Sequence, residues 1–133
     1  MRMNSTMSEY QYIAGSCNIG KGEIRRRQLV GFIGLLVSIS YLVTFNALDA
    51  PAAIRGGIFF PLMVTAIGFV QSRSKFCLAY GFAGTFNIGK LGDIARVASK
   101  EDRAADRKTA LVILGKSLLL AAIATGVVLV LPL

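Results

Sequence analysis

The chain has 133 residues, of which 54% are hydrophobic and 17% charged, and it carries a net charge of +8 without any histidine. The apolar residues come in blocks rather than at a helical or strand period, which favours membrane spans over a soluble core. The lack of histidine excludes a Ser-His-Asp catalytic set, and two cysteines alone cannot complete a tetrahedral zinc site. We therefore expect no metal and no intrinsic cofactor, while bound lipid, or a pigment on the outside of the helices, is compatible with this composition.

Residues 1–28 form a polar and basic segment that lacks the apolar core of a signal peptide. Residues 29–48 follow without a single charge. This run is long enough to cross a bilayer, because a spanning helix needs roughly 20 apolar residues. It predicts the first transmembrane helix, which would also serve as the internal signal for insertion.

Residues 54–70 predict the second transmembrane helix, so that residues 29–70 form a transmembrane hairpin. Pro61 lies in the middle of this run. Because proline removes one backbone hydrogen bond, we expect a kink at this point. Membrane helices tolerate such a kink when neighbouring groups satisfy the freed carbonyl.

Residues 71–109 are expected to form a cytoplasmic segment between the second and third spans. Within it, residues 76–92 are apolar and glycine-rich but too short to span, which predicts an interfacial or re-entrant segment. Residues 93–108 predict an amphipathic helix that continues into the third span, with its charges forming either a solvated face or a surface for a partner. The third span is expected at residues 110–133, where Lys116 can extend its amine back to the headgroups. The predicted fold class is an all-α integral membrane protein with three transmembrane helices.

Basic residues gather before the first span and between the second and third. The positive-inside rule then places the N-terminus in the cytoplasm and the chain in a bacterial inner membrane. We expect six cations near the spans to contact anionic lipid headgroups or a partner: Lys21, Arg25, Arg26, Arg27, Arg73 and Lys75. Lipid headgroups account for the net charge, so a nucleic-acid partner is not expected.

The two cysteines are expected at the same membrane interface, because Cys17 precedes the first span and Cys77 follows the second. In a reducing cytoplasm they would be free thiols. The cations close to each of them favour the thiolate, which is the form that carries persulfide, exchanges disulfides or binds soft metals. The alternative is that both cysteines are small apolar fillers of a packed interior.

A four-residue motif occurs twice, as Asn18 to Lys21 and as Asn87 to Lys90, and each copy is followed by an acid, an isoleucine and an arginine. One interpretation is two similar turns that lead into helices at the same interface. The other is a pseudo-symmetric pair of motifs that approach each other in the fold.

Small residues recur one helical turn apart in two of the spans. Gly34 and Ser38 form such a pair in the first span, and Ala122 and Gly126 form one in the third. Pairs of this kind let helix backbones approach closely in a membrane. We expect them to serve packing within the chain or contact with another protein.

Several motif residues follow one another in a characteristic order: Asn18, Gly20, Glu23, Arg25 to Arg27, Gly31, Pro61, Gly68, Phe69, Phe76, Cys77, Tyr80, Gly81, Gly84 and Asn87. Over roughly residues 17–90 this order resembles the small YgaP-type transmembrane domains of bacteria. The resemblance implies a helical hairpin of a kind that occurs alone or fused to rhodanese domains and mostly lacks an assigned activity. This chain differs in having extra residues before Phe76, no proline after Cys77, and a third span.

The sequence thus predicts a protein that is not an enzyme but an accessory or scaffolding subunit of a larger bacterial membrane complex, an energy-transducing complex being one option. Its expected partners are other integral membrane subunits and anionic lipid headgroups. The alternative is a thiol-based sulfur or redox carrier that uses Cys17 and Cys77. A small transporter is less favoured, because charges within the spans are nearly absent.

Overall fold

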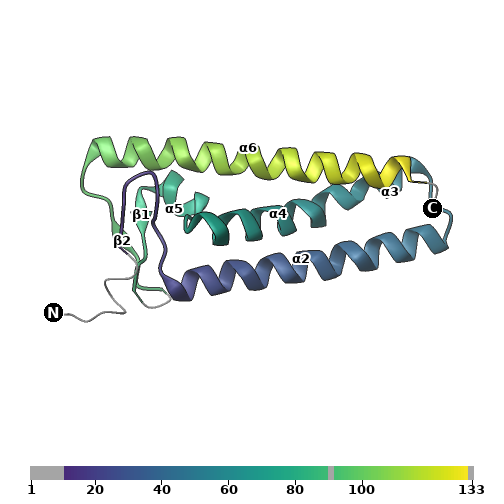
Figure 1. Cartoon of the computed structure of the whole chain (residues 1–133), viewed down its shortest axis with the longest axis horizontal. Helices are drawn as coiled ribbons and strands as arrows, with labels where there is room; N and C mark the ends of the chain where they lie inside the picture. The colour runs from purple at the N-terminus through teal and green to yellow at the C-terminus, as the bar shows by residue number, and fades with distance from the viewer. Residues whose placement is uncertain (1–10, 90–91, 132–133) are drawn as a thin grey trace.

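The computed structural model describes residues 11–89 and 92–131, and three long helical rods dominate it (Figure 1). These rods are α2 (Lys21–Ala47), the consecutive helices α3 (Ala52–Arg55), η1 (Gly56–Ile58) and α4 (Phe59–Ser74), and α6 (Lys100–Val130). Each rod is long and apolar enough to cross a membrane, which confirms the three predicted spans at the level of length and composition. The first ten residues of the N-terminal segment and the last two of the third span lie outside the described residues.

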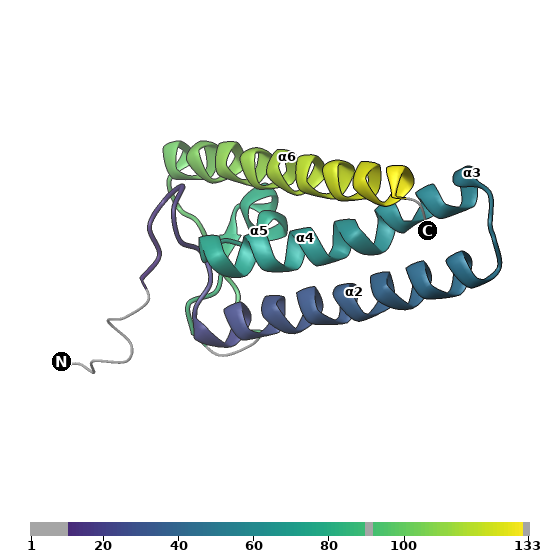
Figure 2. The same cartoon turned by 45° about the vertical axis from the view of Figure 1, so that its right-hand side comes forward.

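The three rods lie side by side in antiparallel order, with α4 between α2 and α6 (Figures 1 and 2). Glycines set the distance between α2 and α4. A Cβ atom on Gly34 would come within 2.7 Å of the Thr65 amide nitrogen, and one on Gly68 within 2.5 Å of the Gly31 nitrogen. Neither position can therefore carry a side chain without moving the two backbones apart.

Pro61 lies in the first turn of α4, which is near the middle of the second rod. The turn that precedes α4 is the 3-10 helix η1, which interrupts the α-helical hydrogen bonds just before the proline. The proline has no N–H and its ring clashes with the preceding turn of an α-helix, so a tighter turn at this point relieves the conflict. At the same end of the bundle, the Tyr41 hydroxyl donates to the Ile54 carbonyl and ties α2 to α3.

Helix α6 begins at Lys100 and runs without interruption to Val130, so the predicted charged helix does continue into the third span. The predicted start at residue 93 is wrong. Residues Ala95–Arg96 form strand β2, which pairs antiparallel with β1 (Thr85–Phe86). The helix starts where Ser99 provides a cap, because its hydroxyl accepts a hydrogen bond from the Asp102 amide. The fold is mostly helical, with this two-residue ladder as its strand content among the described residues.

At one end of the bundle the remaining segments fold into a compact unit, here called the end cap and comprising the described residues of 11–20 and 75–99 (Figure 1). It contains the short helix α5 (Leu78–Ala83), which packs on α6. Phe76, Ala110 and Ile113 are fully buried together, with Val70 and Leu78 against them. This small apolar core fixes the end cap to α4 and α6. Helix α2 begins at Lys21 rather than at residue 29, so the arginine cluster belongs to its first two turns.

Candidate thiol and arginine site

The two copies of the repeated motif meet in the end cap. Ile19 and Asn87 form a parallel bridge, in which the Gly20 amide donates to the Asn87 carbonyl at 2.8 Å and the Asn87 amide to the Asn18 carbonyl at 2.9 Å. A Cβ atom on Gly20 would collide with the Ile88 carbonyl, which explains the glycine at this position. The approach of the two copies agrees with the pseudo-symmetric interpretation. The second copy leads into strand β2 and not directly into a helix, and its Lys90 lies outside the described residues.

The side chain of Asn18 joins the first copy to the segment that carries Cys77. Its amide nitrogen donates to the Cys77 carbonyl at 3.1 Å, and its oxygen accepts from the Cys77 amide at 2.7 Å. The Asn18 backbone amide also donates to the Lys75 carbonyl at 3.1 Å. This pairing holds the two cysteine-bearing segments next to each other, and both Cys17 and Cys77 are buried free thiols.

Arg27 links the cysteine to a buried carboxylate. One guanidinium nitrogen donates to the Cys77 Sγ at 2.9 Å, and the other donates to the Glu23 Oε1 at 3.0 Å. Glu23 is fully buried one helical turn before Arg27, a spacing that brings the two side chains together on α2. The second Glu23 oxygen accepts the Tyr80 hydroxyl, and the Tyr80 ring lies 5.7 Å from the guanidinium carbon. A carboxylate without access to water needs such partners, because an unpaired buried charge is very unfavourable.

Cys17, Tyr80 and Cys77 have different electrostatic surroundings. Burial raises the pKa of the Cys17 thiol, and nearby Lys75 opposes this only in part. The expected effect of a nearby cation on Cys17 is thus outweighed by burial, and the thiol donates to the Ile19 carbonyl at 3.6 Å. Burial and the hydrogen bond to Glu23 raise the pKa of the Tyr80 phenol, so Tyr80 remains the donor in that pair. Cys77, in contrast, has a guanidinium in direct contact with its sulfur.

The six cations expected to contact lipid or a partner fall into two groups. Five of them have exposed side chains at the end of the bundle that carries the end cap: Lys21, Arg25, Arg26, Arg73 and Lys75. Arg27 differs, because only 14% of its side chain is exposed and its guanidinium is bound to Glu23 and Cys77. It is therefore placed as a member of the internal network rather than as a surface cation.

The two pairs of small residues also lie in different environments. Gly34 and Ser38 are buried on the face of α2 that meets α4. Ala122 and Gly126 are exposed on α6, and a Cβ atom added to Gly126 would have no atom within 4 Å. Within the described part of the chain, only the first pair takes part in helix packing.

A second polar cluster connects the N-terminal part of the end cap to α6. The fully buried Asp106 accepts the Tyr12 hydroxyl at 2.6 Å and the Gly15 amide at 2.7 Å, and Thr109 donates to the Gly15 carbonyl at 2.7 Å. Burial and the Asp106 carboxylate raise the pKa of Tyr12 well above its usual value. Sequence reasoning placed Asp106 on a charged face and missed this role, because its partners lie more than 90 residues away.

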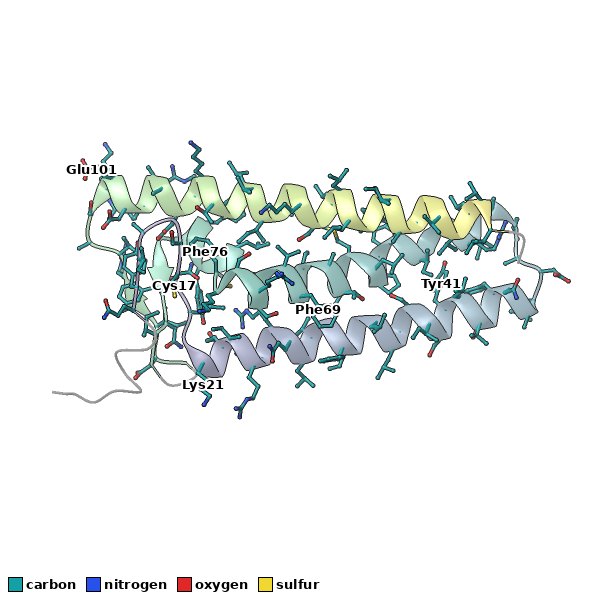
Figure 3. The ribbon with its side chains drawn as sticks, in the orientation of Figure 1. Cys17, Lys21, Tyr41, Phe69, Phe76 and Glu101 are labelled. Carbon is teal, nitrogen blue, oxygen red and sulfur yellow. The ribbon has the colours of Figure 1, made fainter. Side chains whose placement is uncertain are left out.

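No known protein family, curated protein or solved structure matches the chain. Among the residues that the structure describes, no group of three or more His, Cys, Asp or Glu side chains could hold a metal ion. A function must therefore be inferred from the arrangement of Glu23, Arg27, Cys77 and Tyr80 and from the surfaces of the three rods. Figure 3 shows where Cys17 lies in the end cap and where Phe69 lies between the rods.

Proposed function

We propose that the chain is a non-catalytic accessory subunit of a larger bacterial membrane complex and that α6 packs against helices of its partner. The observation that carries this proposal is an outward-facing pair of small residues on α6, Ala122 and Gly126. Their spacing of four residues places them on one face of the helix. A Cβ atom on Gly126 would meet no atom within 4 Å, so this part of α6 is open to close approach by another helix.

The polar side chains inside the rods support a packing role. The hydroxyls of Ser38, Thr65, Ser117 and Thr125 each donate to the carbonyl four residues earlier on their own helix. Such hydroxyls are satisfied locally and do not form a chain of groups along which an ion or proton could move. Intramembrane polar groups that act in transport usually face one another or a water-filled cavity.

The orientation follows from the distribution of exposed cations. Arg25, Arg26, Arg73 and Arg107 are exposed at the end of the rods that carries the end cap. Arg55, together with Asp49, lies near the other end. With the positive-inside rule, this asymmetry supports an inner-membrane orientation in which the end cap faces the cytoplasm.

Purification of the tagged chain from native membranes in mild detergent tests the accessory role. We expect stoichiometric partner subunits to co-purify, and we expect Gly126→Leu to lose them because the added side chain separates the helix backbones. Leu36→Phe serves as the matched control, since Leu36 is 66% exposed on α2, away from the proposed contact. A chain that purifies alone, or partners that remain bound to the Gly126→Leu variant, would contradict the proposal.

A second candidate function is a thiol-based sulfur or redox carrier in which Cys77 is the reacting group. The observation that favours it is the hydrogen bond of 2.9 Å from Arg27 to the Cys77 sulfur, because reactive cysteines are found next to Lys or Arg side chains. Mass spectrometry of the intact chain from native membranes would show a persulfide or mixed disulfide on Cys77. The Cys77→Ser variant would lose that adduct and the Cys17→Ser variant would keep it.

A further inference from the structure

The bundle has an apolar groove between α4 and α6 that none of the contacts described above fills. It has a volume of about 310 Å³, which is at the lower end of the range for small-molecule sites. Five residues from α4 and three from α6 line it: Leu62, Thr65, Ala66, Phe69, Val70, Leu120, Ala121 and Ala124. Phe69 is labelled in Figure 3, on the middle rod.

The groove offers no polar group to an occupant. Thr65 carries the hydroxyl in its lining, and that hydroxyl donates to the Pro61 carbonyl of its own helix at 2.9 Å. The remaining lining side chains are hydrocarbon. A narrow, wholly apolar groove in a membrane-spanning part of the chain is suited to a flexible hydrocarbon chain, since it contains nothing that would recognise a polar side chain of a partner helix.

Two cations lie at the end of the groove that points toward the end cap. Arg73 follows Phe69 by four residues on α4, and Lys116 precedes Leu120 by four residues on α6. Residues four apart lie on the same helix face about one turn, or roughly 6 Å, from each other. Both cations are exposed, and Lys116 can extend its amine along the helix toward the membrane surface.

From this combination we infer that the groove binds one acyl chain of an anionic phospholipid, whose phosphate lies between Arg73 and Lys116. The hydrocarbon groove takes the chain and the two positive charges match the negative headgroup. The site requires the three helices to be inserted in a bilayer but does not depend on the accessory role. It also gives a reason for Lys116, a charge inside the third apolar run that makes no salt bridge among the described residues.

The absence of tryptophan from the sequence permits a direct test. Leu120→Trp introduces a single fluorophore into the groove lining, here called the groove reporter. Leu119→Trp introduces one at the next residue, which lies on a different face of α6 at nearly the same depth and outside the groove lining, and it is called the outer reporter. Each variant is reconstituted into phosphatidylcholine vesicles that contain phosphatidylglycerol, with bromine on the acyl chains of either one lipid or the other. Bromine quenches tryptophan on contact, so the ratio of the two quenching values reports which lipid occupies the site.

We expect brominated phosphatidylglycerol to quench the groove reporter several times more strongly than its share of the vesicle predicts, and the outer reporter in proportion to that share. Each cation near a headgroup strengthens anionic lipid binding by a factor of about five. Arg73→Gln with Lys116→Gln should therefore remove the preference at the groove reporter, whereas Arg73→Lys with Lys116→Arg should keep it. The matched control is Arg25→Gln with Arg26→Gln, which removes two exposed cations elsewhere and should leave the preference unchanged.

Three results would overturn the inference. The first is equal quenching of the groove reporter by both lipids, and the second is a preference that survives the double glutamine variant. The third is a groove reporter that neither brominated lipid quenches, which would show that a second protein helix covers the groove. Native mass spectrometry of the chain without either reporter gives an independent reading, with one retained phosphatidylglycerol expected and none in the double glutamine variant. A failure to find partner subunits would leave all of these readings unaffected.

Discussion

In the helix bundle, α2 and α4 meet through glycines and apolar side chains. The end cap, in contrast, is held together and joined to the helices by hydrogen bonds of three buried side chains: Asn18 in the cap, Glu23 on α2 and Asp106 on α6. The bundle contacts depend on the volume of a side chain. The end-cap contacts depend on the identity of polar atoms and join residues up to 94 positions apart. The two regions should therefore respond to different substitutions: the bundle to added volume, and the hydrogen bonds of the cap to the loss of a donor or an acceptor.

The largest effect is expected from a side chain added at the contact of α2 with α4. Gly68→Leu would place carbon atoms against the Gly31 backbone, where a Cβ alone would lie 2.5 Å from nitrogen. We expect the free energy of unfolding to fall by at least about 3 kcal/mol, as for severe overpacking. Circular dichroism during titration of a mild-detergent sample with sodium dodecyl sulfate measures it.

Gly115→Leu is the control for this change, because the same side chain there meets no atom within 4 Å. In the isolated chain we expect its free energy of unfolding to stay the same or to rise by up to about 1 kcal/mol, because leucine has a higher helix propensity than glycine. Equal losses at both positions would mean that leucine acts through the bilayer or the helix and not through the contact between α2 and α4.

The next effect is expected at Glu23, the buried carboxylate on α2 that faces the end cap. Glu23→Gln keeps the shape of the side chain but removes the charge opposite Arg27, whose side chain is 14% exposed. Breaking one partner of a buried ion pair costs about 3 kcal/mol or more, and we expect a somewhat smaller loss because Arg27 retains some contact with solvent. Glu101→Gln is the matched control at an exposed glutamate. The same unfolding titration compares them, and similar values would contradict the importance of the Glu23 pair.

A smaller effect is expected from Asn18→Ala, which removes both side-chain hydrogen bonds to the Cys77 backbone. The Cys77 carbonyl keeps the Gly81 amide as a donor, but leaving the buried Cys77 amide without a partner costs about 1–3 kcal/mol, and Cys77 should become more accessible. The rate of Cys77 alkylation by iodoacetamide in a Cys17→Ser background measures the second effect. Asn46→Ala, at an exposed position on α2, should leave the rate unchanged. If the alkylation rate of Cys77 does not rise in Asn18→Ala, the hydrogen bonds of the Asn18 side chain are not needed to keep Cys77 buried.

Hydropathy predicts the bundle well because a membrane span is a local property of about 20 residues. The helix ends are less predictable, since α2 continues through the charged residues Lys21 to Arg27 and α6 begins at the Ser99 cap. The polar network could not be predicted in the same way. The pair of Glu23 and Arg27 is visible as a four-residue spacing, but its contact with Cys77 joins residues 50 positions apart. The predicted hairpin and the repeated motif around Asn18 and Asn87 indicated that these segments meet, but not which side chains pair.

The smallest expected effect is on how stability and the alkylation rate of Cys17 depend on pH. It distinguishes Cys17 from Cys77, the other thiol of the end cap. Burial raises the pKa of Cys17 above the ordinary value of about 8.5. The folded state therefore holds this proton more tightly than the unfolded state does. The resulting stability is complete below a pH of about 8.5, and it is lost as the pH rises through the pKa of the folded chain.

In a Cys77→Ser background we expect alkylation of Cys17 to reach half its maximal rate at a higher pH in the folded chain than in the same chain unfolded in sodium dodecyl sulfate. Cys17→Ala should correspondingly reduce the loss of stability above about pH 8.5. Identical alkylation profiles in the two states would show that the Cys17 sulfur is solvated. Cys17 would then behave as a surface thiol. The contact of Arg27 with the Cys77 sulfur would be the remaining difference between the surroundings of the two cysteines.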